Sequence, residues 1–211
     1  AHETGQDALA LRLELLGRVE EQEYSNHGGP KMIPGRLSRL LKFVAGQIDY
    51  GKERPKGHGV GIATHFTFGG YAAHAIEVSV SDDGALTIER IVAAIDCGFA
   101  VNPNAVDAQL QGGTIDGLST ALELEITVRD GQVEQKNFNN YPLMKIESVP
   151  TLFETHVMHY DDTPTGVGEI PVPQAAPALT YDRFNAGGGR DRGRASGGGG
   201  GTGGSAGGGY R

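Results

Sequence analysis

The sequence predicts an α+β domain in which β-hairpins and a mixed sheet pack against helices. Helical apolar spacing comes first, over residues 5–16 and 35–50, and from residue 60 onward the apolar period changes to two. Hairpins then alternate with single helices, instead of the strand–helix–strand series that a doubly wound parallel sheet requires. Each predicted element follows from its own local pattern.

Apolar faces predict the first two helices. Residues 5–16, GQDALALRLELL, place three leucines on one face, and residues 35–50, GRLSRLLKFVAGQIDY, carry a longer apolar stripe. A charged, turn-rich linker, GKERPKGHG, ends the second helix. The residues of the two stripes are Leu9, Leu13 and Leu16 in the first helix, and Leu37, Leu40, Leu41, Val44 and Ile48 in the second.

Alternating patterns then predict a meander of strands. Residues 60–67 and 72–81 have strand periodicity, and the SDDG turn lets residues 85–96, ALTIERIVAAID, pair back as the next strand. An Asn-Pro pair then opens a helix from Pro103 to about Leu122.

The last third of the body is less regular. The sequence ELEITV–RDG–QVEQKNF predicts a further hairpin over residues 123–138, and residues 152–160 predict another strand. Residues 161–177 form a loop rich in proline and glycine, and residues 175–184 predict a short final helix.

Glycine is concentrated at the end of the chain. Residues 187–211 contain 14 of the 34 glycines, together with four arginines and one aspartate. A segment with so little apolar surface to bury is predicted to be disordered, so residues 1–186 form the domain and residues 187–211 a low-complexity tail. Its arginines could touch RNA, but the lack of an RGG repeat and the single aromatic residue favour a tail without a function.

The composition excludes several classes of protein. A net charge of −8 argues against binding to a phosphate backbone, so no nucleic-acid partner is expected. No apolar run is long enough for a transmembrane helix, and the first residues lack the features of a secretory signal, which leaves the compartment (cytoplasmic or periplasmic) open. The single cysteine, Cys97, excludes a disulfide framework, a Cys-based zinc site and an iron–sulfur cluster held by this chain alone. The histidines show no metal-binding spacing, so no metal ligands are expected.

One candidate segment lies in the helix that begins at Pro103. In VNPNAVDAQLQGGTIDGLSTAL, the side-chain amides of Gln109 and Gln111 precede the pair Gly112 and Gly113. Each glycine inside a helix costs ~1 kcal/mol relative to alanine, so glycines indicate a place where something approaches the backbone closely. A ligand is one such partner. The alternative partner is another helix or strand of the same fold, and the spacing alone favours this alternative.

A second candidate segment is TGVGEIPVP, which contains Glu169. Its neighbours are glycines, valines, an isoleucine and prolines, and no lysine or arginine lies within ten positions. Apolar surroundings favour the protonated form of a carboxylate, as a general base near neutral pH requires. On spacing alone, a solvated loop glutamate is the more frequent case.

Together these segments resemble the molybdopterin-binding subunit of the xanthine dehydrogenase/aldehyde oxidase family, nearest to the beta subunit of isoquinoline 1-oxidoreductase-type enzymes. The resemblance runs from Ala1 to about Leu179, and its most specific parts are DCGFAVNPNAVDAQLQGG and GVGE. Because subunits of that family are several times longer, the resemblance implies the C-terminal part of a molybdenum cofactor-binding domain. It also implies that other parts of a longer chain cover the apolar stripes of the first two helices.

The resemblance assigns roles to particular residues. The glutamate of the family's GVGE motif is the active-site base and falls on Glu169, while the glutamine of its A/G-Q-x-E-G-G segment contacts the cofactor and falls on Gln109. The adjoining glycines Gly112, Gly113 and Gly168 are expected to contact the cofactor as well.

The chain also departs from the family pattern. Gln111 stands where the family has glutamate, and Ile170 stands where it has proline, which is expected to alter the wall of the pocket. After Leu179 the family pattern gives way to TYDRFNAGGGRDRGR and the glycine-rich tail.

The implied cofactor is molybdenum bound by molybdopterin, in its cytosine dinucleotide form. The implied reaction is the oxidative hydroxylation of a nitrogen heteroaromatic compound or an aldehyde, with oxygen taken from water. Electrons would leave through iron–sulfur clusters on a small partner subunit, because this chain lacks the cysteines to hold them. Two alternatives stay open: a truncated, non-catalytic fragment, and an interaction module whose tail touches RNA.

Overall fold

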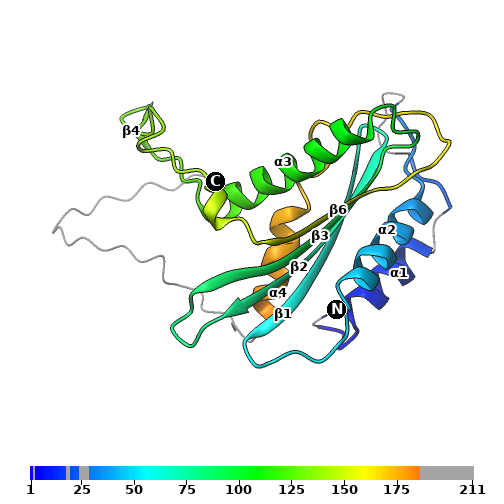
Figure 1. Ribbon diagram of the computed structural model, residues 1–211, viewed down its shortest axis with the longest axis horizontal. Helices are drawn as coiled ribbons and strands as arrows, with labels where there is room; N and C mark the ends of the chain where they lie inside the picture. Colours follow the sequence, from blue (N-terminus) through cyan, green and yellow to red (C-terminus); the bar gives the residue numbers. More distant parts are fainter. Residues whose placement is uncertain (2, 18–19, 24–28, 186–211) are drawn as a thin grey trace, which may run out of the picture.

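A four-stranded mixed sheet with helices on both faces forms the centre of the protein (Figure 1). The computed structural model describes residues 1, 3–17, 20–23 and 29–185, so the predicted tail at 187–211 lies outside the described residues. The sheet order is β1-β2-β3-β6, in which the first three strands are antiparallel and β6 runs parallel to β3. This arrangement confirms the predicted α+β class with a mixed sheet. The strands are β1 (His58–Thr67), β2 (Gly70–Val80), β3 (Leu86–Asp96) and β6 (Leu152–Val157).

Alternation along the strands divides the core into two layers. On β3, Ile91, Ala93 and Ile95 face one side of the sheet, while Val92 and Ala94 face the other. All five side chains are buried, because helices cover both faces of the sheet.

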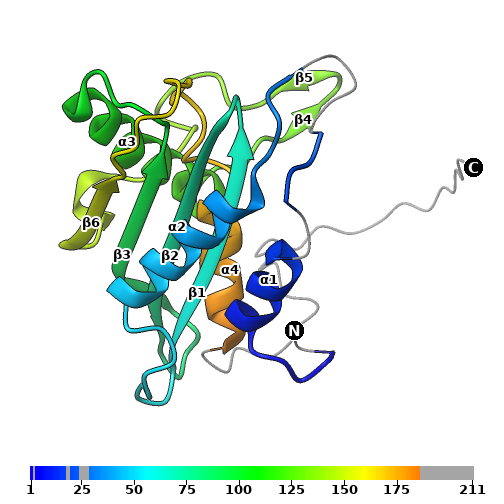
Figure 2. The same cartoon turned by 90° about the vertical axis from the view of Figure 1, so that its right-hand side faces the viewer.

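Helices α1 (Ala8–Gly17) and α2 (Pro34–Gln47) lie on one face of the sheet (Figure 2). Asp7 caps α1 by accepting a hydrogen bond from the backbone N–H of Ala10 at 2.8 Å, so the helix begins three residues later than predicted. The apolar stripe of α2 is buried against β1, β2 and β3 of the same chain. The expectation that other parts of a longer chain cover this stripe is therefore wrong for α2.

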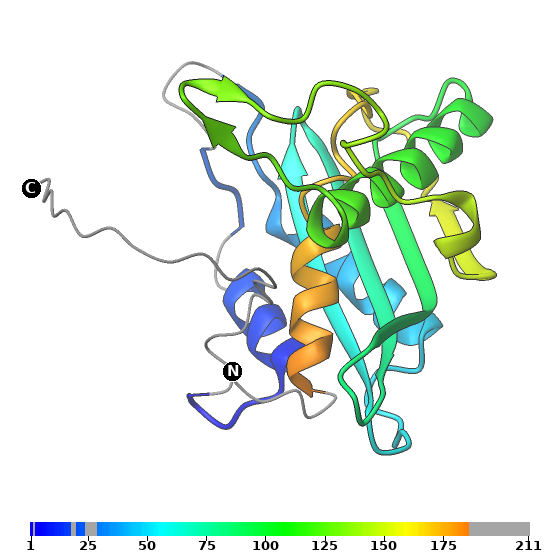
Figure 3. The ribbon, with the colours of Figure 1, turned by 90° about the vertical axis from the view of Figure 1, so that its left-hand side faces the viewer.

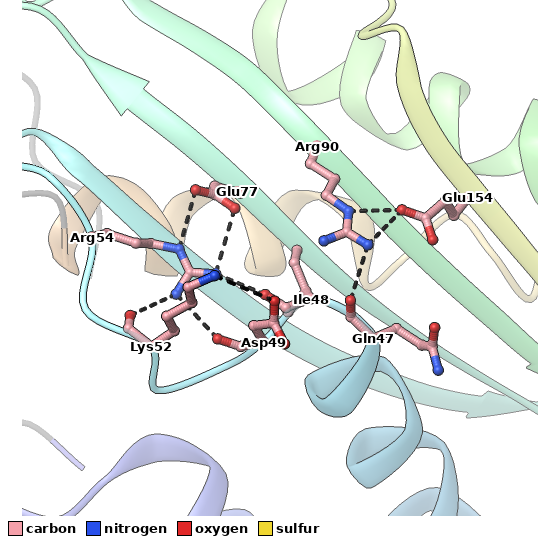
Figure 4. Close-up of polar contacts among 8 residues, drawn as sticks. All are labelled: Gln47, Ile48, Asp49, Lys52, Arg54, Glu77, Arg90 and Glu154. Carbon is pink, nitrogen blue, oxygen red and sulfur yellow. Dashed lines mark hydrogen bonds and ion pairs between the residues drawn. The ribbon is translucent and has the colours of Figure 1, made fainter.

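Two arginines fasten the C-terminal end of α2 to the sheet (Figure 4). Arg54 donates to the carbonyl of Ile48 at 2.8 Å and pairs with Glu77 of β2 at 3.1 Å. Arg90 of β3 donates to the carbonyl of Gln47 at 2.9 Å and to Glu154 of β6. Carbonyls at a helix end lack partners within the helix, and cationic side chains there satisfy them.

Helices α3 (Pro103–Leu122) and α4 (Ala175–Asn185) cover the opposite face (Figure 3). The bounds of α3 are those predicted, because the side chain of Asn102 accepts a hydrogen bond from Ala105 N and Pro103 occupies the first turn. None of the helices in the described part of the chain is long and apolar enough to cross a membrane.

The predicted hairpin over residues 123–138 is much shorter in the structure. Only β4 (Val128–Arg129) and β5 (Gln132–Val133) pair, and their side chains are exposed. A two-stranded ribbon without a covering layer is marginally stable, which explains its short length. The chain then passes through a 3₁₀ turn, η1 (Ile146–Ser148), before it enters β6.

Candidate active site

A buried ion pair lies where β3 ends. The guanidinium of Arg36, on α2, donates through Nε to Asp96 Oδ2 at 2.8 Å and through Nη2 to Asp96 Oδ1. These hydrogen bonds raise the pKa of Arg36. Asp96 Oδ1 also accepts from the backbone N–H of Gly98 at 3.1 Å, so the carboxylate shapes the turn that follows the strand.

This turn is joined to the loop that leads to Glu169. The backbone N–H of Phe99 donates to Asp162 O at 2.9 Å, and that of Thr165 donates to Cys97 O at 3.0 Å. Gly98 has φ +71°, and a β-carbon there would lie 2.4 Å from the carbonyl oxygen of Thr163. A glycine is needed at this point for both its conformation and the close approach of the loop.

The loop is anchored again just after Glu169. Ile170 is fully buried, and its Cδ1 would lie 2.3 Å from a β-carbon built on Gly70, at the start of β2. The backbone N–H of Val172 donates to Glu169 O at 3.1 Å. The position where the family pattern has proline is thus occupied by a core side chain.

The next residues of the loop pack on glycines of α3. A β-carbon on Gly113 would lie 3.0 Å from Pro171 Cβ, and one on Gly117 would lie 2.5 Å from Val172 O. These glycines lie one turn apart on the same face of α3. Another part of the fold therefore approaches Gly113, as the alternative interpretation of the glycines predicted, and its cofactor contact remains a prediction.

This packing brings the two predicted site segments together. Gln109 lies one helical turn before Gly113, and Glu169 lies two residues before Pro171. Both side chains are exposed, and neither hydrogen-bonds to another described side chain. The expectation that apolar neighbours enclose the Glu169 carboxylate is wrong, because Ile170 turns into the core while Glu169 faces outward.

Gly112 and Gly168, which are also predicted to contact the cofactor, differ from Gly113 because no other described part of the fold packs against them. A β-carbon at Gly112 or Gly168 would meet no atom within 4 Å, and both glycines are exposed. Gly112 lies three residues after Gln109 and shares its face of α3. The backbone at Gly112 and Gly168 is therefore accessible to a ligand.

His74 is a buried polar residue that the sequence pattern does not reveal. It is fully buried on β2, and its Nε2 lies 2.6 Å from Thr114 Oγ1 of α3. The Thr114 hydroxyl also lies 2.6 Å from Leu110 O, to which it donates, so we assign the N–H to Nε2 as the donor to Thr114. Burial lowers the pKa of His74 to about 3, which keeps the ring neutral.

Cys97 is buried directly after the end of β3. Burial raises the pKa of its thiol, so the reactive thiolate is disfavoured. Among the described residues, no group of three or more His, Cys, Asp and Glu side chains lies in an arrangement that could hold a metal ion.

Hollows on the surface lie away from Glu169. One of about 620 Å³ is lined by Phe138, Tyr141 and Lys145 among others, beyond the end of α3. Another of about 400 Å³ lies at the β4–β5 hairpin. Neither of these two linings includes Gln109 or Glu169.

Comparison with protein families identifies the part of the chain that includes α3. The molybdopterin cofactor-binding domain matches residues 43–150, which is half of the chain and runs from α2 to just before β6. The chain belongs to this family. Gln109, Gly112 and Gly113 lie within the matched residues, whereas Gly168 and Glu169 follow them.

Relatives of the molybdopterin cofactor-binding chain are named as oxidoreductases and dehydrogenases. Isoquinoline 1-oxidoreductase subunit beta of Brevundimonas diminuta is 31% identical over 149 residues, covering 68% of this chain and 19% of the relative. A membrane-bound aldehyde dehydrogenase (pyrroloquinoline-quinone) of Gluconacetobacter polyoxogenes is 28% identical over 203 residues, covering 91% of this chain and 25% of the relative. The chain thus spans about a fifth to a quarter of the length of these relatives.

This chain is also similar to solved structures of other proteins. CO dehydrogenase from Oligotropha carboxidovorans aligns with a TM-score of 0.49 and 25% sequence identity. The alignment covers 56% of this chain and 15% of that one.

Proposed function

We propose that this chain forms part of a molybdenum hydroxylase, in which Glu169 is the general base and Gln109 contacts the molybdopterin cofactor. The observation that carries the proposal is the contact of Gly113 with Pro171, because it places the helix of the cofactor-binding family beside the loop that bears Glu169. The names of the relatives support an oxidoreductase.

The exposed groups fit a large polar ligand on this face. The Gln109 amide can donate and accept hydrogen bonds, and its side chain is exposed. The open backbone at Gly112 and Gly168 allows a ligand to approach without a side chain in the way. We assign these three residues and Gly113 to cofactor contact, and Gly113 also packs on Pro171.

The chain's own contribution to the chemistry is proton transfer and orientation. When bound, the cofactor would supply the two-electron oxidation. The Glu169 carboxylate would accept a proton from the water-derived oxygen nucleophile, and Gln109 would orient the cofactor. Ile170 in the core and the hydrogen bond to Glu169 O fix the backbone from which the carboxylate projects.

The same proposal covers the substrate and the partner. The substrate would be a nitrogen heteroaromatic compound or an aldehyde, and the cofactor the cytosine dinucleotide form of molybdopterin. Cys97 is the single cysteine and is buried, so iron–sulfur clusters for electron transfer would lie on a small partner subunit.

Metal and isotope analysis of the protein purified from its own cells, with its associated chains, tests the proposal. We expect molybdenum and pterin in equal amounts, and ¹⁸O from labelled water in a hydroxylated heteroaromatic or carboxylate product. Pyrroloquinoline quinone is assayed in parallel, because it appears in the name of one relative. Protein that lacks molybdenum and pterin, or a product labelled from O₂ alone, would contradict the proposal.

A further inference from the structure

We propose that Arg36 and Asp96 form a buried clamp that positions the loop carrying Glu169. The clamp is defined by these two side chains, which are 8% and 1% exposed and lie 60 residues apart in the chain. Its importance for catalysis rests on the proposed function of Glu169, whereas its effect on the loop does not. Both are positioning residues, because neither is placed at the reacting atoms.

The first step runs from α2 to the turn after β3. Arg36 binds both oxygens of Asp96, which fixes the plane of the carboxylate. Oδ1 of that carboxylate then accepts from Gly98 N at 3.1 Å. The turn thus takes its position from a side chain that α2 holds.

The second step runs from the turn to the loop. The turn and the loop exchange backbone hydrogen bonds at Phe99 N and Thr165 N, of 2.9 and 3.0 Å. Arg36 also reaches the loop directly, since its Nη1 lies 3.6 Å from the Asp162 carboxylate. A shift of the guanidinium would therefore move both segments, and Glu169 lies only four residues after Thr165.

The surroundings hold the guanidinium in one orientation. It lies over the ring of Tyr71 at 4.5 Å, and the Tyr71 hydroxyl accepts a hydrogen bond from Ile33 N at 3.0 Å, immediately before α2. A buried ion pair adds little net stability compared with apolar side chains of the same volume. The pair is therefore better explained by the geometry that it imposes than by the stability that it adds.

Amide hydrogen exchange in the 211-residue chain distinguishes positioning of the loop from a contribution to overall stability. The double variant Arg36→Met/Asp96→Leu keeps the buried volume but removes the acceptor for Gly98 N. We expect the amides of Phe99 and Thr165 to exchange about tenfold faster or more, while amides in the centre of β2 keep their protection. Asp96→Asn should give an intermediate effect, because its side-chain oxygen can still accept from Gly98.

The matched control is the double variant Arg90→Met/Glu154→Leu. It removes another arginine–carboxylate pair, which joins β3 to β6, together with the hydrogen bond of Arg90 to Gln47 O at the opposite end of α2. It should leave the amides of Phe99 and Thr165 unchanged. Unchanged exchange in the clamp variant, or equal acceleration in the control, would overturn the clamp.

If the double clamp variant does not fold, the single variant Asp96→Asn tests the clamp. Faster exchange confined to Phe99 and Thr165 then supports the clamp, and unchanged exchange contradicts it. Because no cofactor or turnover enters this measurement, failure of the clamp is distinct from failure of the proposed function, which the turnover of Glu169→Gln tests.

Discussion

Gly117 of α3 lies so close to Val172 that a β-carbon on the glycine would come within 2.5 Å of the valine carbonyl oxygen. The same β-carbon would lie 2.8 Å from Ala175 Cβ, at the start of α4. One turn earlier, Gly113 faces Pro171. Two glycines of α3 thus allow the segment after Glu169 to run directly against the helix.

Gly117→Ala should destabilise the chain, because the added methyl group meets backbone that cannot turn away. We expect a loss of about 1–3 kcal/mol in the free energy of unfolding. Gly112→Ala is the matched control on the same helix, where a β-carbon meets open space. It should stabilise the helix by up to about 1 kcal/mol. Urea unfolding followed by circular dichroism measures both, and equal stability of the two variants would contradict the packing.

The stability of the protein should fall as the pH is lowered from about 6.5 to 3, in part because of His74. Burial lowers the pKa of His74 from 6.5 to about 3 in the folded state, so in this range the unfolded chain binds a proton that the folded chain does not. The loss from this group reaches up to about 5 kcal/mol at the acid end and is absent above its unfolded pKa.

The variant His74→Leu tests this assignment. Thr114 keeps its hydrogen bond to Leu110 O, so the variant removes the titrating group without leaving that hydroxyl unpaired. The dependence of unfolding free energy on pH should become flatter, whereas the exposed His159→Gln should keep the slope of the parent. A His74→Leu slope identical to that of the parent would contradict the assignment.

The segment after α3 should make the isolated chain associate. Phe138 and Ile146 are each 83% exposed, and Val128, Ile126 and Leu143 add further exposed apolar surface. We expect the chain to bind a dye specific for apolar surface and to elute as more than a monomer. Phe138→Ser/Ile146→Ser should reduce both effects more than Leu15→Ser on α1. A monomeric parent chain without dye binding would contradict this expectation.

Local pattern was sufficient for most of the fold. The Asn102–Pro103 start placed α3 correctly, and alternation with a turn at SDDG placed β2 and β3 within two residues. The hairpin near residue 130 was predicted too long, because alternation does not reveal whether a covering layer exists. The apolar sequence neighbours of Glu169 also predicted a buried carboxylate, which is wrong because Ile170 faces the core while Glu169 faces outward.

Local sequence patterns could not predict contacts between residues that are distant in the sequence. Arg36 appeared as one polar residue in an amphipathic helix, and Asp96 as the polar end of a strand. Their pairing depends on how α2 lies on the sheet, which no spacing within either segment encodes. A carboxylate directly after the apolar run of residues 91–95, next to Cys97, is nevertheless a signal that a buried partner exists.

Turnover per molybdenum atom in the Glu169→Gln variant, measured in the purified enzyme with its partner chains, tests the central claim most directly. The variant keeps the volume of the side chain but removes the proton acceptor, and Glu125→Gln, also exposed, is the matched control. Gln109→Ala is predicted to lower molybdenum content or alter the cofactor spectrum. For Glu169→Gln we predict normal molybdenum content and a turnover reduced by about 10²–10⁴-fold or more. Normal turnover with full molybdenum content in this variant would contradict the account.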